Sequence, residues 1–300
     1  MSHLSETELR KITISSCTDN NVSASNSYAV EDKNSHGYKN SRILVLENNV
    51  ELNETHVKKL AKGEYSILHI KKFIGSHSCE QIARGAIQCG YSPYLNVPSV
   101  SRIGMAFYET EGKPELIEEY FAVARKNMNE LRKSCSPVMS PLDTLRCYLD
   151  EIWGPGACLQ TYKSRKMFVG LSRMVEPNTT FLAHHDIFEQ DAPGHVEATS
   201  VISQFAANIY VQVPDSGGEL LMWEMNMPPE EFEKLRGNTY GLEVESLPTP
   251  DLVIKPGCGD LFIFDSRKMH AVAPPIDKPR LALSCFIAYR GDDLPLTYWS

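Results

Sequence analysis

The side chains best suited to metal chemistry gather in one stretch of this 300-residue chain, FLAHHDIF, from Phe181 to Phe188. His184 and Asp186 are separated there by a single residue. In an extended strand, residues i and i+2 point to the same face, so an imidazole and a carboxylate would converge on one point. His185 would point to the opposite face, where packing or support of the ligands is expected rather than metal binding. The stretch therefore predicts two ligands of a metal ion.

A third ligand is predicted at His270, which follows the strand-like segment GDLFIF. Two histidines and one carboxylate on one side of a metal, with open positions opposite, are typical of iron(II) sites that activate oxygen. The alternative is that the His-x-Asp triplet arises by chance and that these histidines are ordinary core or surface residues.

Arg280 is the residue that favours the metal interpretation. It opens the strand-like segment RLALSCFIAY, in which Arg280, Ala282, Ser284 and Phe286 share one face. Oxygen activation at ferrous iron needs electrons that a 2-oxoacid can supply, and the planar guanidinium of Arg can bind a remote carboxylate through two hydrogen bonds. Arg280 is therefore predicted to bind a co-substrate such as 2-oxoglutarate, with Ser284 adding a hydroxyl. The alternative for Arg280 is a surface salt bridge.

Further contacts are predicted from two other strand-like segments. Asn208 and Tyr210 share a face of SQFAANIYVQV and are candidates for contact with co-substrate or water, unless that face is turned to solvent. Arg173 precedes the metal-binding stretch and is a candidate contact for substrate or co-substrate. Phe188 and Trp223 are candidate substrate contacts.

The remaining substrate contacts are expected from the helical first part of the chain and from the segments 187–200 and 224–250. Segment 187–200 is a candidate lid over the site. It carries Glu189, Asp191 and Glu197, which would suit a cationic substrate, although a run of charges is more often a solvated face.

The patterns around these residues predict a helical first part and a strand-rich second part. Residues 1–40 are rich in Ser and Asn and are expected to form a tail without fixed structure. Residues 41–300 are expected to form one domain, with 41–160 as a helical buttress that includes some strands and 161–300 as the β core. The helices are predicted at Cys79–Cys89, from Pro114 to Leu131, at Pro141–Ile152 and at Pro228–Arg236.

Composition narrows the classes of function. The net charge of −8 and the pI of about 5.6 argue against a nucleic-acid partner. No apolar run is long enough to span a membrane, and the start of the sequence has no secretory pattern, so a cytoplasmic location is expected. The eight cysteines form no CxxC pair, which argues against structural zinc. The oligomeric state stays open, a homodimer included.

Taken together, His184-x-Asp186, His270 and Arg280 resemble the Fe(II)/2-oxoglutarate-dependent oxygenases. The segments ILHIKKFI, CEQIARG, PDSGGELLMW, GDLFIF, PRLALSCFIAY and the terminal TYWS resemble in particular the carrier-independent indole-alkaloid halogenases and their hydroxylase relatives. This resemblance runs from about Ser41 to the end. It implies a mainly β fold with a helical buttress, the double-stranded β-helix or cupin-like jelly roll.

Asp186 is the departure from the halogenase pattern. In those halogenases the carboxylate position is a small residue, usually Gly, which leaves room for chloride on the iron. With Asp186 in that place, the resemblance implies a dioxygenase that uses Fe(II), 2-oxoglutarate and O2 and releases succinate and CO2. It would hydroxylate an unactivated C–H bond of a small free-standing substrate, namely an alkaloid, another natural-product intermediate or an amino-acid derivative. Desaturation, cyclisation and epimerisation remain alternatives, as does a non-catalytic jelly-roll binding protein.

Overall fold

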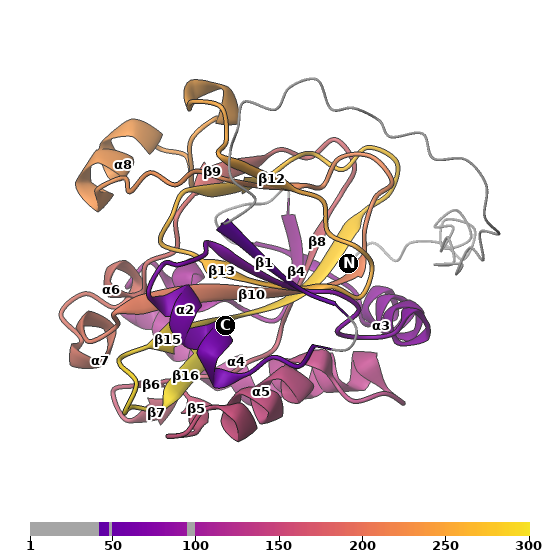
Figure 1. Ribbon diagram of the computed structural model, residues 1–300, viewed down its shortest axis with the longest axis horizontal. Coiled ribbons are helices and arrows are strands. Elements are labelled where there is room, and N and C mark those ends of the chain that lie inside the picture. The colour runs from indigo at the N-terminus through magenta and orange to yellow at the C-terminus, as the bar shows by residue number, and fades with distance from the viewer. Residues whose placement is uncertain (1–41, 48–49, 95–99) are drawn as a thin grey trace. The chain divides into compact units, whose positions relative to one another are not determined.

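The computed structural model describes residues 42–47, 50–94 and 100–300, so the expected tail at residues 1–40 lies outside the described residues. Two facing sheets with helices on the outside make up most of the described chain (Figure 1), which confirms the predicted fold class. The large sheet runs in the order β1 (Ile43–Leu46), β2 (Ile67–Ile70), β13 (Leu261–Asp265), β10 (Ser203–Gln212), β15 (Arg280–Tyr289), β8 (Leu171–Val175), β4 (Val100–Ile103) and β3 (Ser92–Pro93).

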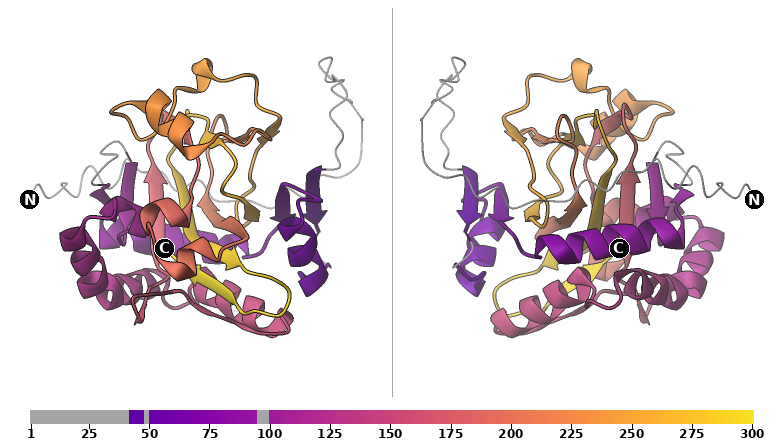
Figure 2. Two further views of the ribbon diagram at one scale, coloured as in Figure 1. Left: turned by 90° about the vertical axis from the view of Figure 1, so that its left-hand side faces the viewer. Right: turned by 90° about the vertical axis from the view of Figure 1, so that its right-hand side faces the viewer.

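The second sheet is smaller and carries part of the predicted metal-binding stretch. It faces the large sheet in both views of Figure 2. Its order is β12 (Leu252–Ile254), β11 (Leu220–Met222), β14 (His270–Val272) and β9 (Phe181–His184). Two further strands extend the large sheet: β16 (Leu296–Trp299) pairs with β15, and β5 (Ala157–Leu159) pairs with β16. The strands β6 (Thr161–Tyr162) and β7 (Arg165–Lys166) form a separate hairpin.

Helices cover the outer face of the large sheet. The longest, α4 (Pro114–Cys135), begins with a proline whose fixed φ suits a first helical turn, and it buries Ile117, Tyr120 and Leu131. The other helices are α2 (Glu54–Ala61), α3 (Ser76–Cys89), α5 (Pro141–Ile152), α6 (Phe188–Asp191), α7 (Val196–Thr199) and α8 (Pro229–Arg236), with single 3-10 turns η2 (Phe107–Thr110) and η3 (Val244–Ser246).

The alternation of side chains along β15 divides the core in two, as the sequence predicts. Leu281 and Leu283 pack with α3, α4 and α5 on the outer side. Ala282 and Phe286 pack with the smaller sheet on the inner side. Arg280 shares this inner face, so the fold carries its buried guanidinium into the space between the sheets.

Several element boundaries differ from those predicted. The strand predicted over 181–188 ends at His184, and Phe188 already begins α6. The helix α3 begins at Ser76, three residues before the predicted start at Cys79, with Gly75 at its N-cap. The helix α2 and the strand β16 were not predicted, because each is short and carries few apolar residues in a regular pattern. Within the described ranges, no helix is both long and apolar enough to cross a membrane.

Candidate metal centre and adjoining cavities

His184 and His270 face each other across two neighbouring strands. His184 ends β9, His270 begins β14, and the antiparallel register pairs the two residues directly. Their ring centroids lie 4.4 Å apart. A ligand atom from each of His184, Asp186 and His270 lies within 4.8 Å of the other two. The fold therefore brings together the three residues that the sequence singles out as ligands.

Asp186 reaches this point from outside the strand. Its backbone N–H donates to the carbonyl of Ser266 at 2.8 Å, and this bond anchors the chain after β9 ends. The carboxylate Oδ2 lies 3.4 Å from Nε2 of His270. The convergence of His184 and Asp186 thus depends on a tertiary hydrogen bond, and the simple alternation of a regular strand does not explain it.

Backbone carbonyls fix the orientation of both imidazoles. Nδ1 of His184 lies 2.8 Å from the carbonyl of Leu182, and Nδ1 of His270 lies 2.9 Å from the carbonyl of Lys268. A carbonyl can only accept, so in each ring Nδ1 carries the proton and Nε2 keeps its lone pair. Metal-binding histidines usually donate their second N–H to a carbonyl or carboxylate in this way.

The electrostatics of the cluster suit a metal ion. Burial, followed by the nearby His270, lowers the pKa of His184 to about 4, so its imidazole is neutral near pH 7. Burial alone would raise the pKa of Asp186, but the nearby His270, His184 and Arg173 lower that pKa to about 2. Neutral imidazoles and an ionised carboxylate are the protonation states that bind a metal. The donor set therefore fits iron(II).

A small inner cavity leads from the cluster to Arg280. Its lining includes His184, Asp186 and His270 as well as Arg280. Arg280 is 6% exposed, and the described part of the chain offers it no carboxylate in an ion pair. Its Nε has no hydrogen-bond partner there either. A buried guanidinium without a counter-charge is unfavourable, so this end of the cavity is suited to an anion.

The other predicted co-substrate residues surround the same guanidinium. Asn208 lines the inner cavity. The guanidinium carbon of Arg280 lies 4.8 Å from the ring centroid of Tyr210. Ser284 pairs with Asn208 across β10 and β15, and its buried hydroxyl has no described hydrogen-bond partner, although it does not line the cavity.

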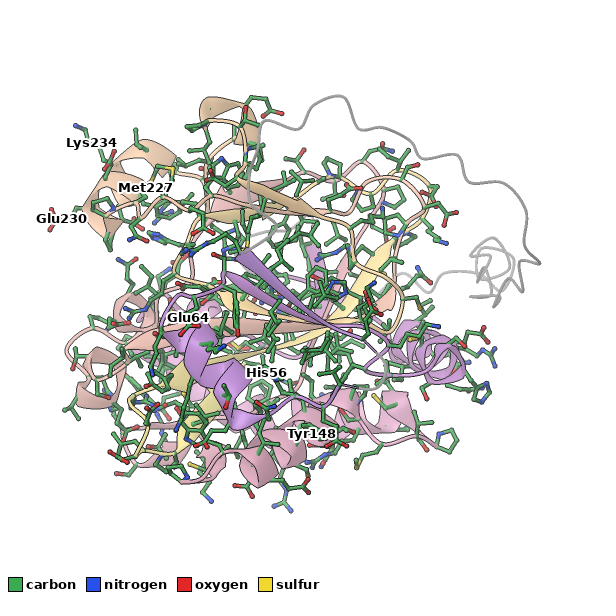
Figure 3. The ribbon with its side chains drawn as sticks, viewed as in Figure 1. His56, Glu64, Tyr148, Met227, Glu230 and Lys234 are labelled. Carbon is green, nitrogen blue, oxygen red and sulfur yellow. The ribbon has the colours of Figure 1, made fainter. Side chains whose placement is uncertain are left out.

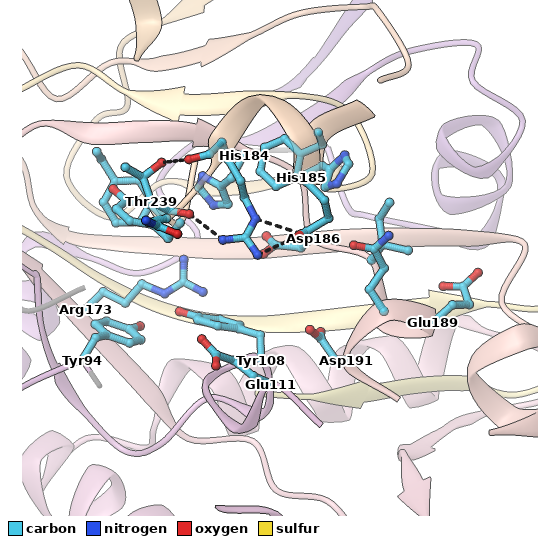
Figure 4. Close-up of a pocket in the computed structure, with 18 residues that line it drawn as sticks. Tyr94, Tyr108, Glu111, Arg173, His184, His185, Asp186, Glu189, Asp191 and Thr239 are labelled. Atoms are coloured by element: carbon cyan, nitrogen blue, oxygen red, sulfur yellow. Dashed lines mark hydrogen bonds and ion pairs between the residues drawn. The ribbon is translucent and has the colours of Figure 1, made fainter. Parts of the chain in front are cut away.

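A larger outer cavity of about 630 Å³ adjoins the inner one. The two share Arg173, Phe181, His184 and Asp186, so the cluster lies where they meet. Figure 4 shows the labelled side chains of the outer cavity around this point. The cavity draws its walls from three distant parts of the chain: Tyr94, Tyr108 and Glu111; Ile187, Glu189, Gln190 and Asp191; and Phe232, Glu233, Arg236, Asn238, Thr239 and Tyr240.

The structure places one of the predicted substrate contacts at the cavities and the other two away from them. Arg173 lines both cavities. Phe188 and Trp223, the other two candidates, line neither cavity. Phe188 is fully buried beside Trp299, and Trp223 packs under the segment that carries α8. His185, expected on the far face, lines the outer cavity because the strand ends before it.

Two segments after the strands close the outer cavity. The first residues of segment 187–200, the candidate lid, form one wall. The segment is held by buried Phe188 and by Glu197, which accepts a hydrogen bond from Gln160. The segment that carries α8 forms the opposite wall. Its Glu230 and Lys234 point outward (Figure 3), whereas Phe232 is buried. Segment 224–250, which is expected to supply substrate contacts, thus lines the outer cavity, but sequence reasoning named none of these residues individually because no motif marks them.

Comparison with known proteins identifies the domain. Residues 169–288 match the family model of the 2OG-Fe(II) oxygenase superfamily, and the match includes His184, Asp186, His270 and Arg280. This part of the chain is therefore a 2OG-Fe(II) oxygenase superfamily domain. The expectation of iron(II), 2-oxoglutarate and O2 is confirmed by the match. No curated protein matches the sequence of the chain.

Two solved structures of one enzyme, with TM-scores above 0.5, show the same fold at low sequence identity. An N-substituted L-amino acid dioxygenase from Burkholderia ambifaria AMMD is 14% identical with a TM-score of 0.56, and the match covers 82% of this chain and 91% of that one. The same enzyme in complex with 2-oxoglutarate gives the same score and identity, with 82% and 90% covered. A prolyl-4-hydroxylase from Pseudomonas putida is 14% identical with a TM-score of 0.40, covering 78% and 97%.

Proposed function

We propose that this 2OG-Fe(II) oxygenase superfamily domain hydroxylates an unactivated C–H bond of a small free-standing substrate. His184, Asp186 and His270 would hold iron(II), and Arg280 would bind the distal carboxylate of 2-oxoglutarate. The observation that carries the proposal is the position of the cluster. It lies between an inner cavity that ends at an unpaired Arg280 and an outer cavity large enough for a small molecule. Residues 41–300 are proposed to act as one domain.

The residues of this chain would position the reactants and exclude water. Iron(II) and 2-oxoglutarate, when bound, would supply the oxidising power from O2, with 2-oxoglutarate converted to succinate and CO2. Arg280 holds the co-substrate by its far end, and Tyr210 packs against the guanidinium and limits its movement. The backbone carbonyl partners of His184 and His270 would keep both Nε2 atoms aimed at one point. Phe181 and His185 exclude water from the side that faces the substrate.

Asp186 is the residue that favours hydroxylation over halogenation. Its carboxylate reaches the cluster and would fill the coordination position that a halide needs. Among the substrate classes considered, the similar fold of an N-substituted L-amino acid dioxygenase supports an amino-acid derivative. Alkaloids and other natural-product intermediates of similar size remain within the proposal.

The mass of the coupled product tests the proposed reaction. We expect a product heavier than the substrate by one oxygen atom, formed with one succinate per turnover, from a substrate screen read by succinate release. A product lighter by two hydrogens would show desaturation or cyclisation, and an unchanged mass would show epimerisation. A protein that neither retains iron nor forms succinate would support the non-catalytic binding protein instead.

A further inference from the structure

Most charged side chains of the outer cavity already have a partner. Glu189 pairs with Arg267, Glu233 with Arg236, and Glu111 with Lys113, all within salt-bridge distance. The carboxylate of Asp186 belongs to the candidate metal centre. Only two charged residues of the lining remain, Arg173 and Asp191, and neither has an ion pair with any described residue.

Arg173 has no carboxylate within salt-bridge distance among the described residues, although the more distant carboxylate of Asp186 attracts it. It lies on β8, and its neighbour in the register on β4 is Arg102. Arg102 is neutralised by Glu109, with two hydrogen bonds of 2.7 Å. Arg173 has no such partner among the described residues. Its guanidinium carbon lies 5.9 Å from the ring centroid of Tyr108, and its Nε is buried without a hydrogen-bond partner. A buried cation of this kind favours the binding of an anion.

Asp191 complements Arg173, because it is an acidic residue of the same cavity without a cationic partner among the described residues. It ends α6, and the described residues offer its carboxyl group neither a hydrogen bond nor a cation. Burial, together with the charges of Asp186 and Glu189, holds the pKa of this carboxyl well above its usual range. An ammonium group at this position would offset the repulsion and stabilise the ionised carboxylate.

We infer that the substrate carries both a carboxylate, which binds Arg173, and a basic amine, which binds Asp191. In Figure 4 the side chains of Arg173 and Asp191 lie on either side of Tyr108, so an apolar portion of the substrate can pack on that ring. The substrate class is therefore an amphoteric amine-carboxylate with an apolar portion. This inference rests on the proposed function, because it assigns the two groups to the substrate of that site.

A carboxylate near Arg173 has two possible sources. Arg173 lines the inner cavity as well as the outer one, so the carboxylate could belong to the substrate or to 2-oxoglutarate itself. The two sources differ in what the loss of Arg173 changes. A substrate contact alters the preference among substrates, whereas a co-substrate contact weakens the binding of 2-oxoglutarate.

Binding of matched probes to the anaerobic protein with Fe(II) and 2-oxoglutarate tests the inference. The probes are L-phenylalanine against phenethylamine and 3-phenylpropionate, and 6-aminohexanoate against hexylamine and hexanoate. We expect at least one amphoteric probe to bind about tenfold or more tightly than both of its singly charged analogues, because each analogue leaves one buried charge unpaired. Equal binding within both sets, or no binding by any probe, would overturn the inference.

Two variants then assign the two contacts. Asp191→Asn should remove the advantage of the amphoteric probe over the carboxylate-only analogue, and Arg173→Gln should remove its advantage over the amine-only analogue. The matched control Asp215→Asn alters a carboxylate that is 83% exposed and should leave both ratios unchanged. If Arg173→Gln weakens 2-oxoglutarate binding and leaves the ratios intact, Arg173 serves the co-substrate and the inference is wrong.

The same titrations separate this inference from the proposed function. Iron and 2-oxoglutarate that bind while no amphoteric probe is preferred would overturn the substrate class alone. A protein that binds neither iron nor 2-oxoglutarate would overturn both.

Discussion

Replacement of Asp186 by Gly is expected to reduce the rate of formation of the hydroxylated product more than about 100-fold. This loss exceeds the loss usually seen when a residue that only supports a metal ligand is removed. Asp186 would be the only anionic ligand of the three, so its loss leaves two neutral imidazoles to hold a divalent cation. The variant also opens the coordination position that a small residue leaves free in the carrier-independent halogenases. The measurement is the mass of the product formed in buffer that contains chloride.

The fold should tolerate this change, which makes the result interpretable. Asp186 is held through its backbone N–H to Ser266, and that bond does not involve the carboxylate. The control is Asp215→Asn, which removes an exposed carboxylate far along the chain from the cluster. If Asp186→Gly hydroxylates as well as the parent protein, Asp186 is not a ligand and the argument against halogenation fails with it.

Replacement of Arg280 by Gln is expected to raise the KM for 2-oxoglutarate at least about 30-fold. Removal of one partner from a buried charge pair costs about 2–5 kcal/mol, and each 1.4 kcal/mol is a factor of ten in affinity. Arg280 is 6% exposed and unpaired among the described residues, so a bound carboxylate would depend on it strongly. Arg280→Lys should be impaired less, because it keeps the charge but not the planar pair of donors.

A comparison of two oxoacids shows whether Arg280 contacts the distal carboxylate. The wild-type protein should prefer 2-oxoglutarate over 2-oxopentanoate, which has a methyl group in place of that carboxylate. Arg280→Gln should lose this preference, whereas Arg125→Gln, on the exposed face of α4, should keep it. A preference that survives in Arg280→Gln would show that another residue binds the carboxylate.

The sequence predicted the parts of the site that depend on local pattern. The alternation along 280–289 placed Arg280 on the inner face, and the structure agrees, because a long central strand keeps its period of two. His270 was chosen because it follows a strong strand, and the register of β14 with β9 places it opposite His184.

The parts that were missed depend on tertiary contacts. His185 lines the outer cavity because β9 ends at His184, and the hydrogen bond from Asp186 to Ser266 that then directs the chain has no signature in the sequence. Tyr94 and Tyr240 reach one cavity from distant parts of the chain, and neither lies in a motif. Phe188 was placed in the site by proximity along the chain, but the start of α6 turns it into the core.

The most direct test of the central claim is succinate formation from 2-oxoglutarate by the purified protein. We expect succinate to form only with added Fe(II), to stop when a chelator removes the metal, and to be lost in both His184→Ala and His270→Ala. Iron content measured on the same samples shows whether the lost activity follows lost metal. Succinate formation that continues unchanged in either histidine variant would contradict the account, because the cluster would then not be the site of the reaction.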